Sequence, residues 1–193
     1  PDQRHIRYSD VLQLKEVVKT EFNIEGNPVP EWIDIVKQVR PTQATLVPDS
    51  KDVVTSNQGW DTVRHKDYLT EIVNELKLEG IRVSVFVDPI VEMIEGSKAV
   101  GADRIELYTG PYAEEFSLNR EHAIEQYISA AEVAHKIGLE INAGHDLNLH
   151  NLKFFKQRIS HLDEVSIGHA LICDAIYLGL ENTIQMYLRQ LKD

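Results

Sequence analysis

The sequence predicts an α/β fold, in the form of a TIM-type (β/α)8 barrel that lacks its N-terminal β1-α1-β2 portion. Strand and helix patterns alternate along the 193 residues without a break, which is typical of parallel strands joined by right-handed crossover helices. Four of the strand patterns end on a residue that can hold or move a proton, namely Glu25, Tyr108, His145 and His169, and the C-terminal strand ends of a barrel converge on one site. No G-x-G-x-x-G or G-x-x-x-x-G-K motif favours an open nucleotide-binding sheet instead.

Runs of apolar, β-favouring residues predict six strands, and helical patterns precede the first strand and follow each of the six. The strands are expected at residues 21–25, 43–48, 81–87, 104–108, 139–145 and 165–169. The helices are expected from Ser9, a plausible N-cap, then at about 30–39, 61–78, 90–100, 120–137 and 149–159, with one or two more from Ala170. Pro30 suits a first helical turn, and Gly80 and Gly138 mark helix ends.

The length of the chain indicates an incomplete barrel. A (β/α)8 barrel typically needs about 250 residues, and the chain falls short by roughly two strands and one helix. The opening at Pro1 also reads like a loop entered midway. We therefore expect residues 1–193 to form a single (β/α)8-barrel domain that is N-terminally incomplete.

Composition excludes several classes of partner. The net charge is −11 with no basic run, which argues against nucleic acid, because binding to phosphate backbones needs a concentrated cationic face. No apolar run approaches the length of a membrane span and no signal peptide is visible, so a cytoplasmic protein is expected. Cys173 is the single cysteine, which fits a reducing compartment; its apolar helical surroundings predict that it is buried.

Two carboxylates stand at the end of a predicted strand or within one, where sheet stability does not require them. Glu25 ends an apolar strand, and a carboxylate in such an apolar strand mouth is expected to have a raised proton affinity, as a general acid or base needs. Glu106 lies between Ile105 and Leu107, so alternation points it into the barrel interior, where a charge is costly unless it is paired or functional. A solvated or ion-paired glutamate is the competing interpretation of Glu25.

Two histidines each follow a glycine at a strand end. His145 and His169 occupy matching positions on the last two predicted strands, and the helix start after Gly168 could bind a phosphate through its N–H groups. A polar loop that contains Thr55 also follows a strand, and it could be a substrate loop or a merely solvated one. The competing interpretation of each histidine is a structural role, because a lone histidine usually has one.

Other chemistries remain as alternatives. No lysine ends a strand, which weakens a Schiff-base aldolase mechanism. A metal-dependent sugar-phosphate isomerase or hydrolase could use the same strand ends, although no short-spaced ligand pair supports a metal site. Its ligands would come from Glu25, Asp88, Glu106, His145 and His169. A third interpretation is a non-catalytic fragment kept for assembly.

Six segments, taken in order along the whole chain, resemble the pyridoxine 5′-phosphate synthase family of vitamin B6 biosynthesis. They are residues 1–6, 22–27, 45–49, 104–110, 142–148 and 166–170. The resemblance implies a condensing enzyme (a transferase) that joins 1-deoxy-D-xylulose 5-phosphate to 3-amino-2-oxopropyl phosphate and releases phosphate and water. It implies acid/base catalysis with no cofactor and no metal, and a homo-octamer.

The resemblance also assigns roles to residues of this chain. Glu25 and His145 would be catalytic acid/base groups, and Glu106 would stabilise charge in the transition state. His5 and Thr55 would contact the deoxyxylulose phosphate. The aminoketone phosphate would be bound by Asp146, through its main chain, and by Gly168 and His169.

One departure from the family pattern lies at the start of the chain. A catalytic His, in a His-x-Arg motif, normally stands immediately before Pro1, and the first strand carries substrate-binding residues. We therefore expect a polypeptide of these 193 residues alone to be inactive and to fold poorly.

Overall fold

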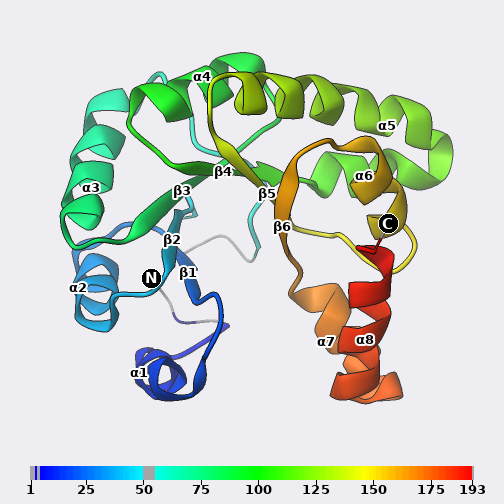
Figure 1. Cartoon of the computed structure of the whole chain (residues 1–193), viewed down its shortest axis with the longest axis horizontal. Coiled ribbons are helices and arrows are strands. Elements are labelled where there is room, and N and C mark those ends of the chain that lie inside the picture. The colour runs from blue at the N-terminus through cyan, green and yellow to red at the C-terminus, as the bar shows by residue number, and fades with distance from the viewer. Residues whose placement is uncertain (1–2, 4, 50–54, 193) are drawn as a thin grey trace.

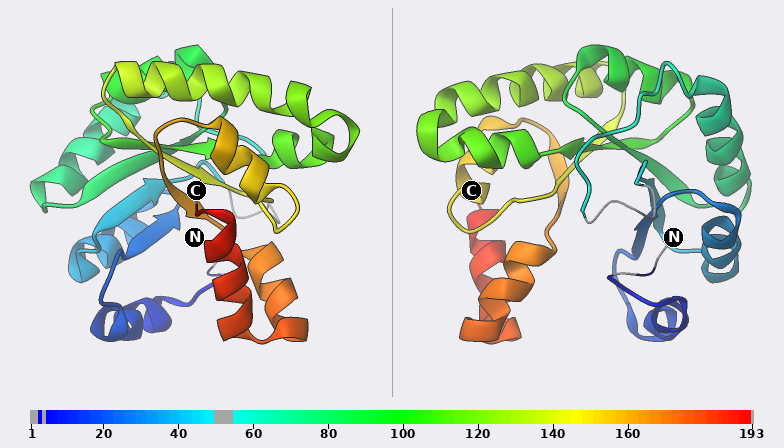
Figure 2. Two further views of the ribbon diagram at one scale, coloured as in Figure 1. Left: turned by 45° about the vertical axis from the view of Figure 1, so that its right-hand side comes forward. Right: turned by 180° about the vertical axis from the view of Figure 1, so that it is seen from behind.

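A computed structural model describes residues 3, 5–49 and 55–192 (Figure 1). Within them, six parallel strands form one sheet in the order β1-β2-β3-β4-β5-β6. The strands are β1 Asn23–Gly26, β2 Gln43–Leu46, β3 Arg82–Val87, β4 Arg104–Tyr108, β5 Glu140–Gly144 and β6 Leu162–Ser166. The sheet curls into part of a barrel, with helices along its outer side (Figures 1 and 2). This confirms the predicted α/β class and the incomplete (β/α)8 barrel.

The helices alternate with the strands, as the sequence predicts. They are α1 Tyr8–Val17, α2 Pro30–Val39, α3 Lys66–Leu78, α4 Val91–Ala99, α5 Gly110–Lys136, α6 Leu152–Arg158, α7 His169–Leu178 and α8 Leu180–Gln190. Figure 2 shows α1 at the β1 end of the curled sheet and the α7–α8 pair at the β6 end. No helix of the described segments is both long and apolar enough to cross a membrane.

The two faces of the sheet differ in polarity. Apolar residues such as Leu46, Val85 and Ile105 are fully buried in the core between the sheet and the helices. Their sequence neighbours point to the other face, which is the barrel interior, because successive strand residues alternate. Several of those interior positions hold buried polar side chains, namely Gln43, Thr45, Ser84, Arg104, Glu106 and Asn142. The interior is therefore a polar site wall rather than an apolar core.

Several element boundaries differ from the predicted ones. Helix α3 begins at Lys66 and not at about 61, because residues 62–65 form turns. The last strand is Leu162–Ser166, not 165–169, because its polar residues are satisfied: Asp163 accepts the Ile141 N–H at 2.8 Å and Glu164 pairs with Arg104. Helix α5 already begins at Gly110, since proline is tolerated in a first turn, and it is kinked at Asn119. Helix α1 begins at Tyr8 with Arg7 as its N-cap, so Ser9 is not the cap.

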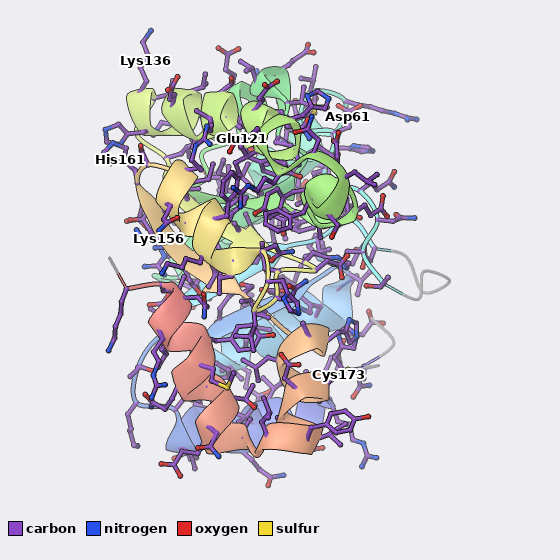
Figure 3. All side chains as sticks on the ribbon, turned by 90° about the vertical axis from the view of Figure 1, so that its right-hand side faces the viewer. Asp61, Glu121, Lys136, Lys156, His161 and Cys173 are labelled. Carbon is purple, nitrogen blue, oxygen red and sulfur yellow. The ribbon has the colours of Figure 1, made fainter. Side chains whose placement is uncertain are left out.

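The prediction that Cys173 is buried is wrong. Cys173 is exposed on α7, a helix in which no residue is buried (Figure 3). The apolar side chains of α7 include Ile176 and Tyr177, whose exposed fractions are 76% and 88%. An apolar helical pattern leads to burial only where another element covers it, and among the described elements α8 is the one that packs closely on α7.

Candidate active site

One cavity of about 700 Å³ opens at the C-terminal ends of the strands, and all eight predicted site residues line it. They are His5, Thr55, Glu25, Glu106, His145, Asp146, Gly168 and His169. They come from the opening loop, strands β1 and β4, the loop after β2, the end of β5 and the start of α7. Residues up to 164 positions apart in the chain therefore share one wall. Their individual roles stay predictions.

The Glu106 carboxyl is the buried centre of this wall. Its exposed fraction is 3%, and Asn142 donates a hydrogen bond from Nδ2 to Glu106 Oε2 at 2.9 Å. Glu106 and Asn142 are direct partners in the register of β4 and β5, which brings their side chains to the same face. Gly144 leaves the room for this carboxyl, since a Cβ at Gly144 would overlap Glu106 Oε1.

Burial raises the pKa of Glu106 well above its ordinary range, and the nearby Glu25 and Glu164 carboxylates raise it further. The side chain of Glu25 is open to water in the cavity, but the barrel wall surrounds it, and this desolvation raises the pKa of Glu25 as well. A hydrogen bond from Ser166 opposes the rise at Glu25. The contact between the two carboxyls acts on them in opposite directions, since it raises the pKa of Glu106 and lowers that of Glu25.

The positive charge of Arg104, which lies in the same strand as Glu106, is already neutralised by carboxylates. The Arg104 side chain is 8% exposed and donates from Nη2 to Glu140 Oε2 at 2.6 Å, and it also pairs with Glu164. Burial raises the pKa of Glu164, and the Arg104 charge opposes that effect. Arg104 therefore balances the interior carboxylates and is not free to bind a substrate phosphate.

His145 stands at the point where the chain leaves β5. Its Nε2 lies 2.7 Å from Thr55 Oγ1, and its Nδ1 lies 2.8 Å from Asp146 Oδ2. The edge of its ring meets Tyr108, with 5.3 Å between ring centroids. The buried Thr109 hydroxyl donates to the Gly144 carbonyl at 2.7 Å and also contacts the His145 carbonyl, which fixes the end of the strand.

The loop that carries Thr55 is anchored on two strand ends. Ser56 donates from Oγ to Asp49 Oδ2 at 2.6 Å, and the Gly59 N–H donates to Asp88 Oδ2 at 3.1 Å. Asp88, a candidate metal ligand by residue type, thus anchors the loop and is not among the described residues that line the cavity. Across the described chain, no group of three or more His, Cys, Asp or Glu side chains is placed to hold a metal ion.

His5 and His169 meet at another part of the cavity. Their rings make an edge-to-face contact with 5.1 Å between centroids. His169 is the first residue of α7 and follows Gly168, and no side chain of the described residues caps this helix start. The first N–H groups of a helix bind anions well, so this end of the cavity suits a phosphate.

Asn142 and Ser166 are site residues that the sequence did not single out. Asn142 donates to Ser166 Oγ at 3.0 Å as well as to Glu106, so it joins β4, β5 and β6. The signal for Asn142 was present, because a buried amide within an apolar strand needs a partner. Ser166 gave no such signal, because serine is common at strand ends.

A family model described as "Pyridoxal phosphate biosynthesis protein PdxJ" matches residues 1–193. Relatives named "Pyridoxine 5'-phosphate synthase" from Cytophaga hutchinsonii and Christiangramia forsetii are 62% and 56% identical over 192 residues. Each alignment covers 100% of this chain and 81% of the relative. A relative of the same name from Porphyromonas gingivalis is 53% identical over 191 residues, which are 99% of this chain and 80% of that protein.

Solved structures of more distant proteins share the fold. A BexX/CysO complex from Amycolatopsis orientalis matches with a TM-score of 0.62 and 14% identity, over 99% of this chain and 76% of that one. A monomeric form of phosphoribosylanthranilate isomerase from Thermotoga maritima matches with a TM-score of 0.58 and 11% identity, over 98% of this chain and 81% of that one. At these identities the likeness concerns the fold alone.

Proposed function

This chain belongs to the PdxJ family of pyridoxal phosphate biosynthesis proteins, and on that premise we propose that it catalyses the ring-closing step that yields pyridoxine 5′-phosphate. The proposed substrates are 1-deoxy-D-xylulose 5-phosphate and 3-amino-2-oxopropyl phosphate, and phosphate and water are released. The observation that carries the proposal is the meeting of Glu25, Glu106 and His145 in one cavity.

The chemistry of ring closure suits such a set of groups. The amine of one substrate condenses with the carbonyl of the other, and dehydration and enolisation follow. Each of these steps moves a proton, so several acid and base groups around one bound intermediate are required. Glu106, whose pKa is raised well above its ordinary range, Glu25 beside it and the imidazole of His145 supply both donors and acceptors.

We assign the roles as follows. Glu25 accepts and returns protons, His145 is the second proton carrier, and Glu106 stabilises charge that develops in the transition state. At the helix start, Gly168 and His169 hold the phosphate of the aminoketone. His5 and Thr55 contact the deoxyxylulose phosphate. The helix N–H groups replace the cationic side chain that a phosphate site often uses.

The experiment is a ring-closure assay of the purified full-length protein with both substrates, with mass spectrometry of the product. Formation of pyridoxine 5′-phosphate is expected, and activity should survive treatment with a chelator. No product under any condition would overturn the proposal. Activity that chelation abolishes and a divalent ion restores would favour the metal-dependent alternative.

We further propose that the protein is a cytoplasmic homo-oligomer, an octamer as the family resemblance implies. Support comes from the apolar side chains that α7 exposes, since contiguous exposed apolar surface is unusual on a monomer. Sedimentation analysis should give a mass well above that of one chain. A monomer at all concentrations tested would contradict this.

A further inference from the structure

The side chain of Asp146 has a contact that substrate binding does not explain. Its Oδ2 lies 2.8 Å from Nδ1 of His145, while the other ring nitrogen, Nε2, lies 2.7 Å from Thr55 Oγ1. The imidazole is therefore held at both nitrogens, by a carboxylate on one side and by a hydroxyl on the other. The Asp146 side chain is 48% exposed and the His145 side chain is 16% exposed, so the ring is the more enclosed of the two.

These contacts determine which nitrogen carries the proton. An ionised carboxylate only accepts hydrogen bonds, so Nδ1 must be the protonated nitrogen of the neutral ring. Nε2 is then the acceptor, and it takes its hydrogen bond from the Thr55 hydroxyl. Nε2 is thus the basic atom on the Thr55 side, where His145 and Thr55 both line the cavity.

The backbone at residues 145–146 has an unusual conformation that accompanies the contact between the two side chains. His145 and Asp146 have φ values of 82° and 59°, which place two consecutive non-glycine residues in the left-handed region. Such conformations cost free energy and persist where the surroundings hold them. Asn148 and Asn151 donate to the Asp146 carbonyl at 3.3 and 3.2 Å, which fixes the turn.

We propose that Asp146 is a positioning residue for His145: its carboxylate fixes the tautomer and orientation of the ring and stabilises the imidazolium that forms during proton transfer. This inference rests on the proposed function of His145 as a proton carrier. It assigns the Asp146 side chain to the histidine, whereas the family resemblance implies only a main-chain contact with the aminoketone phosphate. A carboxylate behind a catalytic histidine acts in this way in other enzymes.

Two substitutions separate charge from hydrogen bonding, and both tolerate the left-handed backbone. Asp146→Asn retains an acceptor for Nδ1 but removes the charge, and Asp146→Gly removes the side chain. Asp34→Asn, which removes a charge from the exposed side of α2, is the matched control. The Tyr108 phenol and the Glu25 carboxyl also interact with His145, and all three variants keep both groups.

For ring closure, we expect both Asp146 variants to lower kcat by about 10- to 100-fold, with KM for either substrate changed less than threefold. Asp34→Asn should behave as the unchanged protein. An unchanged kcat, or an effect on KM alone, would overturn the proposal.

A second measurement needs no turnover and therefore separates this inference from the proposed function. Two-bond ¹H–¹⁵N NMR spectra above the titration of the ring report its tautomer, and a His145→Asn spectrum identifies the signal. The Nδ1–H form should predominate in the unchanged protein and in Asp34→Asn, and Asp146→Gly should show a mixture of both forms. If the unchanged protein has the Nε2–H form, the positioning role is wrong, even if ring closure is confirmed.

Discussion

At the scale of single residues, the site depends on carboxyls that the fold holds close together. Glu25, Glu106 and Glu164 face one another across the barrel interior, with Ser166 and Asn142 as hydrogen-bond partners. Because burial and mutual repulsion disfavour the charged forms, Glu106 retains its proton at a pH where an exposed glutamate is ionised. This retained proton is what an acid catalyst requires, and it has a cost in stability.

The pH dependence of stability should report the proton on Glu106. Its pKa is raised in the folded protein, so the folded state binds this proton more tightly than the unfolded state, and the stabilisation is lost as pH rises from the ordinary glutamate pKa through the raised one. Glu106→Gln removes this dependence of stability on proton binding. Each unit by which the pKa is raised changes the free energy of unfolding by about 1.4 kcal/mol.

We therefore expect Glu106→Gln to gain stability relative to the unchanged protein as pH rises from 5 to 8, while it loses ring-closing activity. Urea unfolding at several pH values measures the first effect. The control is Glu132→Gln, a charge removal on the exposed side of α5. A parallel pH dependence in Glu106→Gln and Glu132→Gln would show that Glu106 is ionised in the folded state.

Gly144→Ala tests whether the missing side chain at Gly144 is what places Glu106. The added methyl would overlap Glu106 Oε1 and lie 3.2 Å from Ser166 Cβ, so we expect a loss of about 1–3 kcal/mol in stability and a lowered kcat. In a Glu106→Ala background the same substitution should cost much less, because the clash is removed. Equal costs in the two backgrounds would contradict the packing argument.

At the scale of elements, the sequence predicted which residues lie at the strand ends, but it did not predict which elements contact one another. Glu25, Glu106 and His145 were found because charged or titratable residues interrupt apolar strand patterns. The early end of β6 and the early start of α5 were missed because Arg104 satisfies Glu164 from another strand, and because Pro111 follows Gly110 in a first helical turn. The exposure of Cys173 was also missed, because an apolar periodic pattern does not show whether another element covers that face of the helix.

The turn between β4 and α5 should control the position of His145. Thr109→Val keeps the shape of the side chain but removes the hydroxyl that donates to the end of β5, so we expect a loss of about 1–3 kcal/mol in stability and a lowered kcat. Thr183→Val is the matched control, since Thr183 is also fully buried and its hydroxyl donates to the Gly179 carbonyl at 2.9 Å, far along the chain in α8. The control should lose stability without losing kcat. If both variants keep full kcat, the turn does not position His145.

At the scale of the whole molecule, the curled sheet brings one polar face of six strands around a common cavity. The sequence predicted this arrangement because an unbroken strand–helix alternation requires parallel strands, whose C-terminal ends share one side. The sequence could not predict which of the eight predicted site residues contact one another. The joining of Thr55 and Asp146 through His145 depends on a loop anchored on β2 and β3 and on two left-handed residues after β5.

We propose above all that the carboxyl of Glu25 moves protons during ring closure in this cavity. The most direct test is kcat for pyridoxine 5′-phosphate formation by the full-length protein and by its Glu25→Gln variant, with Glu132→Gln as the control. We expect Glu25→Gln to fold normally and to lose about 10²- to 10⁴-fold in kcat, while the control keeps its activity. A Glu25→Gln protein that turns over as fast as the unchanged protein would show that Glu25 does not transfer protons in the reaction.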